Sequence, residues 1–203
     1  MKKILLTLTV MLASVATYAQ HAVGTVTLQP KVGLNVASLT DMKGSDPRIG
    51  LAAGAELEYQ AGDIVSVSAG LLYSMQGGKY DKSVQMLGMS QSGKLTFKED
   101  YINIPIMANV YVLKGLAVKF GVQPSFNVHN AIEASTNGIA GSGSQSLSYK
   151  ENTFDFALPV GMSYEYNNVV FDARYNWGVT HALKGLDSRN SVFQLTLGYK
   201  FEL

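Results

Sequence analysis

The last eleven residues of the chain alternate between large apolar side chains and polar or small ones. The apolar positions are Phe193, Leu195, Leu197, Tyr199, Phe201 and Leu203, and the positions between them are Gln194, Thr196, Gly198, Lys200 and Glu202. Because successive side chains of a β-strand point to opposite faces of the sheet, this pattern predicts a strand with one apolar and one polar face. A chain that repeats the pattern is restricted to sheets whose two faces meet different surroundings.

The same alternation recurs along the chain and predicts eight strands. Their ranges are 28–38, 48–59, 64–76, 101–112, 116–128, 152–166, 169–179 and 193–203. Three connections are tight turns (60–63, 113–115 and 167–168), and four are longer and polar (39–47, 77–100, 129–151 and 180–190). An even number of strands with short turns on one side and long loops on the other is typical of bacterial outer-membrane barrels. We therefore expect an all-β fold, an eight-stranded antiparallel transmembrane β-barrel with up-and-down meander topology.

The charged residues of the predicted strands share the polar face. None lies on the apolar face; Asp100 has that parity, but we place it in the preceding loop, at the rim. A Lys or Arg that faces lipid at the bilayer midplane costs about 2–4 kcal/mol, so a barrel in lipid must turn its charges inward. We expect a charge network in the lumen formed by Lys31, Arg48, Glu56, Glu58, Lys119, Asp155, Glu165, Asp172, Arg174 and Lys200. Since eight strands leave an interior only wide enough for side chains, a salt-bridged plug is favoured over an ion path.

Periodicity alone leaves a soluble barrel open, because such a barrel has the same alternation with its apolar face inside. The aromatic residues favour the membrane, since they gather near both ends of the predicted strands, as in interfacial girdles. One group is Tyr59, Tyr164, Tyr166, Tyr199 and Phe201, and the other is Tyr73, Phe126, Phe154, Tyr175 and Trp177.

The N-terminus has the three parts of a secretory signal peptide. Lys2 and Lys3 precede a mostly apolar run over 4–16, and residues 17–19 offer small side chains at the outer positions of a cleavage site. The run is well short of the roughly 20 residues that a membrane-spanning helix needs. We expect a signal peptide over 1–19, a short N-terminal tail over 20–27 and the barrel over 28–203.

The composition excludes several classes of protein and site. The chain has no cysteine, which excludes a disulfide framework and a thiolate metal site. Its net charge is +1, and loss of Lys2 and Lys3 with the signal lowers it to −1, so nothing indicates a nucleic-acid partner. His21 lies in the tail, and His129 and His181 begin long loops, where exposed histidines are favoured over a metal site. With no metalloprotease, nucleophile-elbow or Walker motif present, we expect no catalytic, cofactor or metal site.

Four prolines lie inside the predicted strands, namely Pro30, Pro105, Pro124 and Pro159. Proline removes a hydrogen bond from the ladder, and a closed barrel has no edge strand where this is harmless. Local bulges are one way to accommodate them.

Four features of the sequence carry a family resemblance: the signal ending Ala19-Gln20, the segments 101–105 and 121–124, and the closing strand. In these features the chain resembles, over nearly its whole length, the outer-membrane β-barrel family that is abundant in Bacteroidota, often labelled porin-family or PorT-like. The resemblance implies an outer-membrane location. It also implies that Thr196, Gly198, Phe201 and Leu203 form the signal that the barrel assembly machinery reads during insertion, although the terminal residue is often Phe rather than Leu.

These features predict a non-enzymatic outer-membrane protein with a filled lumen, surrounded by lipid. It would act as a membrane scaffold or through a protein partner at its long loops, Gly77–Asp100 and His129–Glu151. The resemblance implies an alternative, a PorT-like component of a secretion or assembly system. A small-solute channel would show conductance that depends on Lys119 or Arg174, and a soluble periplasmic ligand carrier would need its apolar face inside. A barrel enzyme would need His, Asp and Glu side chains to converge at the outer rim, and their scattered positions argue against this.

Overall fold

The computed structural model describes residues 21–40, 45–86, 89–138, 141–147, 153–180 and 189–203. Its strands are β1 (Val26–Thr40), β2 (Ser45–Gln60), β3 (Val65–Met86), β4 (Met89–Asn103), β5 (Ile106–Leu113), β6 (Leu116–Gly138), β7 (Gly141–Leu147), β8 (Phe154–Tyr166), β9 (Val169–Gly178), β10 (Arg189–Tyr199) and β11 (Phe201–Glu202). The described residues include no helix that is long and apolar enough to cross a membrane. The predicted signal peptide lies outside them.

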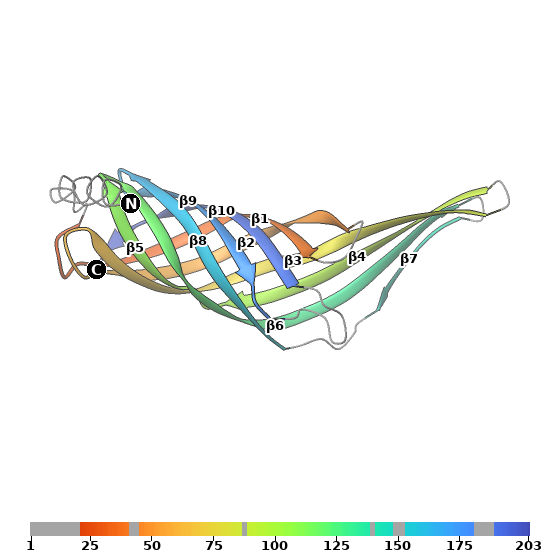
Figure 1. The fold of residues 1–203 in the computed structure, drawn as a ribbon, viewed down its shortest axis with the longest axis horizontal. Helices are drawn as coiled ribbons and strands as arrows, with labels where there is room; N and C mark the ends of the chain where they lie inside the picture. The colour runs from red at the N-terminus through yellow and green to blue at the C-terminus, as the bar shows by residue number, and fades with distance from the viewer. Residues whose placement is uncertain (1–20, 41–44, 87–88, 139–140, 148–152, 181–188) are drawn as a thin grey trace, which may run out of the picture.

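These segments form the expected closed barrel of eight antiparallel strands (Figure 1). β4 and β5 continue one another as a single barrel strand, as do β10 and β11, and β7 lies outside the barrel wall. Neighbours in the chain pair with one another, and the ring closes where β1 pairs with β10 and β11, in a register that includes Lys31↔Gly198 and Thr27↔Glu202. The predicted meander topology is confirmed.

Polar side chains fill the barrel and apolar side chains cover its outer surface, as the alternation predicted. On β10, Leu195 is 49% exposed, whereas the adjacent Gln194 and Thr196 are buried. The same alternation runs along β8 and β9, where Val160, Phe171 and other large apolar side chains are exposed. A soluble barrel has the opposite arrangement. The prediction of a soluble ligand carrier, which needs an apolar interior, is therefore wrong.

The in-strand prolines lie at short gaps in the hydrogen-bond ladder. At these gaps no partner calls for a backbone N–H, so the lack of one in proline costs no hydrogen bond. Pro30 pairs with β2 on one side and faces the break between β10 and β11 on the other. Pro159 pairs with β9 and faces a gap between the β6 residues Phe120 and Gln123. Pro124 faces the break between β4 and β5, which also contains Pro105. The pairing register is the same on both sides of each gap, so none of these prolines needs a bulge.

Two predicted loops are mostly β-structure, which corrects their assignment. β3 and β4 continue through Gly77–Asp100 as a hairpin whose last pair is Met86↔Met89. β6 runs on to Gly138 and turns back into β7. β4 also pairs with β6 up to Ser92↔Asn137, so the outer parts of β3, β4 and β6 form one sheet with β7. This projecting sheet extends far from the barrel, at the end opposite the C-terminus (Figure 1).

The expected position of Asp100 is also wrong. Asp100 lies within β4 and is buried, rather than standing in a loop. It keeps the parity of the apolar face, since it pairs with the exposed His129 and accepts a hydrogen bond from Tyr73, which is 39% exposed. The register shift against β6 adds its extra residue to β6, because Asp100 pairs with His129 and Tyr101 pairs with Asn127.

Candidate functional site

Five of the predicted lumen charges meet in one cluster at the centre of the barrel. The central layer consists of Lys31 from β1, Glu56 from β2, Lys119 from β6, and Asp172 and Arg174 from β9. All five side chains are at most 4% exposed. Each lies on the polar face of its strand, so the alternation along four separate strands brings them together.

Two carboxylates hold three cations in the central layer. Asp172 Oδ2 lies 2.7 Å from Lys119 Nζ and 2.8 Å from Arg174 Nη2. Glu56 Oε2 lies 2.7 Å from Lys31 Nζ, and Arg174 Nη2 lies 3.0 Å from Glu56 Oε1. Arg174 Nε also donates to Asp172 Oδ1 at 2.9 Å. Every charged group therefore has an oppositely charged partner, which is what burial of charge requires.

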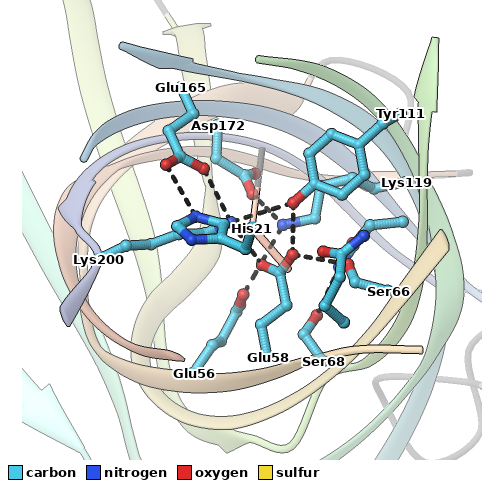
Figure 2. Close-up of polar contacts among 12 residues, drawn as sticks. His21, Glu56, Glu58, Ser66, Ser68, Tyr111, Lys119, Glu165, Asp172 and Lys200 are labelled. Atoms are coloured by element: carbon cyan, nitrogen blue, oxygen red, sulfur yellow. Dashed lines mark hydrogen bonds and ion pairs between the residues drawn. The ribbon is translucent and has the colours of Figure 1, made fainter. Parts of the chain in front are cut away.

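A second cluster lies nearer the end of the barrel that carries the C-terminus. Figure 2 shows five of its residues (His21, Glu58, Tyr111, Glu165 and Lys200) beside Glu56, Lys119 and Asp172 of the central layer. We call this second cluster the mouth layer; it consists of His21, Glu58, Tyr111, Glu165, Lys200 and Glu202. Lys200 Nζ bridges two carboxylates of this layer, at 2.9 Å from Glu58 Oε2 and 3.0 Å from Glu165 Oε2. Tyr111 donates its hydroxyl proton to Glu58 Oε1 at 2.5 Å and accepts a hydrogen bond from Lys200 at 3.1 Å.

His21 closes the mouth layer. Its Nε2 lies 3.1 Å from Glu165 Oε1 and its Nδ1 lies 2.7 Å from Glu202 Oε1. The residue is only 8% exposed, so it is not a histidine of a free tail. The hydrogen bond to Glu165 raises the pKa of His21 above its ordinary value of 6.5, against the opposing effect of burial.

Two predicted members of the network lie apart from both layers. Asp155 is buried near the other end of the lumen, where Asn190 donates to its Oδ2 at 3.0 Å and Thr180 donates to its Oδ1. Arg48 is half-buried and donates to the backbone carbonyl of Gln76. Sequence reasoning therefore placed all ten residues on one face, but only eight of them share the two layers.

Three members of the mouth layer, His21, Tyr111 and Glu202, are not part of the predicted network. His21 precedes the first strand, so no periodicity marks it, and its partners Glu165 and Glu202 are 144 and 181 residues away. Tyr111 is buried in the lumen, but its phenol carries no charge, so a search for charged residues on the polar faces does not find it. Tyr111 lies two residues after the lumen-facing Asn109, and this spacing is the sequence feature that indicates a lumen-facing side chain.

The four residues of the expected insertion signal lie on or next to the closing strands. Thr196 and Gly198 are buried on the lumen side of β10, opposite Gly33 and Lys31 of β1. Phe201 and Leu203 are exposed on the outer surface, at 50% and 76%. These four residues therefore lie on both faces of the chain at the seam where the barrel closes.

The charged side chains of the two layers form ion pairs across the lumen. Among the described residues, no group of three or more histidine and carboxylate side chains is arranged to hold a metal ion. The buried cations and carboxylates of both layers are each engaged with partners on other strands. Chemically, the arrangement stabilises a filled interior.

The sequence matches a family of known membrane barrels. A model of the outer membrane protein beta-barrel domain matches residues 18–184. The chain belongs to this outer-membrane β-barrel family. Together with the apolar outer surface, membership places the protein in the outer membrane, as a barrel of eight strands with a polar interior.

Several solved outer-membrane proteins are similar to this family member. Ail, the attachment invasion locus protein of Yersinia pestis, is 14% identical, with 89% of this chain and 100% of that chain covered and a TM-score of 0.45. Neisserial surface protein A is 16% identical, with 87% and 97% covered and a TM-score of 0.48. The translocator domain of the autotransporter NalP from Neisseria meningitidis is 13% identical, with 90% and 91% covered and a TM-score of 0.35. A comparison with curated proteins gave no significant match.

Proposed function

We propose that this protein is a non-enzymatic outer-membrane barrel that presents its projecting sheet to a protein partner outside the membrane. The observation that carries the proposal is the free edge of β7. Among the described strands β7 pairs only with β6, so its other side offers unpaired backbone N–H and C=O groups. Such an edge is a template for an additional strand.

The sequence of β7 leaves this edge open. Natural proteins protect edge strands with charges, prolines or bulges. The sequence of β7 is Gly-Ser-Gly-Ser-Gln-Ser-Leu, which contains no charged residue and no proline. The opposite edge of the projecting sheet, beyond the last pairing of β3 with β2 at Tyr80, carries Asp81 and Lys82 instead. We therefore assign the partner to β7, as an extended polypeptide segment that adds a strand.

The closed lumen supports an anchoring role for the barrel itself. Two layers of paired charges fill the interior, which argues against the small-solute channel. A secretion or assembly component of the PorT-like kind is a second candidate that the same edge favours, since such a component needs a stable protein partner. It adds the expectation that deletion of the chain reduces secretion of other proteins.

A photo-reactive amino acid placed in the full-length protein in intact cells tests the proposed edge. We expect a discrete cross-linked species from Ser144 on β7. The matched control is Ser92 on β4, which lies in the same sheet but pairs on both sides, with Ser83 and with Asn137. Cross-links of equal yield from both positions, or none from Ser144, would contradict recognition through this edge.

A further inference from the structure

The geometry of His21 requires a charged ring. Both ring nitrogens lie within hydrogen-bond distance of carboxylate oxygens, at 3.1 and 2.7 Å. An ionised carboxylate only accepts hydrogen bonds, and a neutral imidazole donates only one. Both contacts are therefore satisfied at once only when His21 carries protons on Nδ1 and Nε2.

The two carboxylates beside the ring differ in burial. The Glu165 side chain is 3% exposed, whereas that of Glu202 is 61% exposed. The proton on Nε2 therefore faces a buried carboxylate, and an ion pair with a buried carboxylate is strongly unfavourable to break.

His21 joins the two ends of the described chain. The N-terminal segment 21–25 is attached through backbone bonds such as Gly24 N to Gln60 O at 2.8 Å. β11 pairs with β1 beyond the gap at Pro30, and Leu203 N donates to Val26 O at 3.0 Å. The His21 ring connects both to Glu165 on β8, across the mouth of the barrel.

We propose that protonated His21 is a pH-dependent fastener that holds the N-terminal segment and β11 in the periplasmic mouth of the barrel. When the ring loses its proton, at most one of its two carboxylate contacts keeps a hydrogen, so the segment and the end of β11 loosen. The mouth layer of the lumen then becomes accessible from the periplasm.

The groups that face His21 set the direction of the response. They are Glu165 from β8, Glu202 from β11 and Lys200 from the link between β10 and β11, with Glu58 of β2 and Tyr111 of β5 behind Lys200. Glu165 and Glu202 raise the pKa of His21, whereas burial and, to a smaller extent, Lys200 lower it. A raised pKa means that the fastener is complete below pH 6.5 and is lost as the pH rises through the folded-state pKa.

The absence of cysteine in the chain makes a single-site label possible. Val23 is 54% exposed beside the fastener, so Val23→Cys carries a nitroxide in the otherwise unchanged protein, reconstituted in lipid vesicles. We expect an immobilised spectrum at about pH 5 and an increasing mobile fraction towards about pH 9, with a midpoint above the ordinary histidine value. A spectrum that does not change over this range would overturn the proposal without any further variant.

Two substitutions of His21 separate charge from shape. His21→Gln removes the titratable charge, so we expect a mobile label at every pH, whereas His21→Arg keeps a cation and should keep the label immobilised throughout. Heat-dependent gel migration establishes that each variant is a folded barrel. If either variant retained the pH response of the parent, another group would be responsible and the assignment to His21 would be wrong.

Discussion

At the scale of single residues, the protein depends on a few charges that water cannot reach. Asp172 contacts Lys119 and Arg174 within 2.9 Å and lies 3.6 Å from Lys31, so one carboxylate serves three cations. Removing one partner from a buried ion pair leaves uncompensated charge and costs far more than the pair contributes. The central layer is therefore the position where a minimal chemical change should have its largest effect.

We predict that Asp172→Asn, which keeps the shape of the side chain, lowers the free energy of unfolding by about 3–5 kcal/mol. Urea unfolding of the barrel reconstituted in lipid measures this change. Lys114→Gln is the control, since Lys114 lies exposed in the turn after β5, and we expect a change within about 0.5 kcal/mol. Equal stabilities for both variants would mean that the central layer is not a determinant of stability.

At the scale of strands, the outward face of each strand is defined by contact with lipid. We predict that Leu195→Arg, in the middle of β10, destabilises the barrel by about 2–4 kcal/mol, and that Tyr166→Arg, at the periplasmic end of β8, costs about 0–1 kcal/mol. Unfolding in lipid vesicles compares the two. A similar cost at both depths would contradict a membrane centred on the outer apolar surface.

The closing strands give a second prediction at this scale. If β10 and the residues after it carry the insertion signal, Phe201→Ser lowers the amount of assembled barrel in the outer membrane several-fold. Phe171→Ser on β9 is the matched control, because Phe171 is also an outward phenylalanine and is 58% exposed. Quantifying folded protein in outer-membrane fractions distinguishes them. Equal losses would assign the effect to lost lipid contact rather than to a signal.

How much of these strands the sequence predicts depends on whether a segment meets lipid. The barrel strands alternate in polarity because one face touches lipid, so their faces and order were predictable. The outer part of the β3–β4 hairpin lacks that alternation in its sequence, although backbone pairing holds it up to Met86↔Met89. His21 has no periodic neighbour at all, and only the closed barrel brings it to Glu165. The bulge beside Asp100 similarly depends on pairing with β6.

At the scale of the whole molecule, the filled lumen determines whether solutes pass. The central layer draws its side chains from β1, β2, β6 and β9, and these side chains meet across the lumen of an eight-stranded barrel. An interior of this width holds side chains rather than a column of water. Ions would have to displace paired charges, whose separation in a buried environment is strongly unfavourable.

We therefore predict that the protein is electrically silent in a planar lipid bilayer. Heat-dependent gel migration of the same preparation shows that silent samples contain closed barrels. Steady single-channel currents that change in Lys119→Gln would instead assign the lumen a transport role, since Lys119 contacts both carboxylates of the central layer, at 2.7 and 3.8 Å. If the folded protein conducts no current, the projecting sheet is the part through which it acts. The outer wall of the barrel contacts lipid, and its interior is filled with ion pairs.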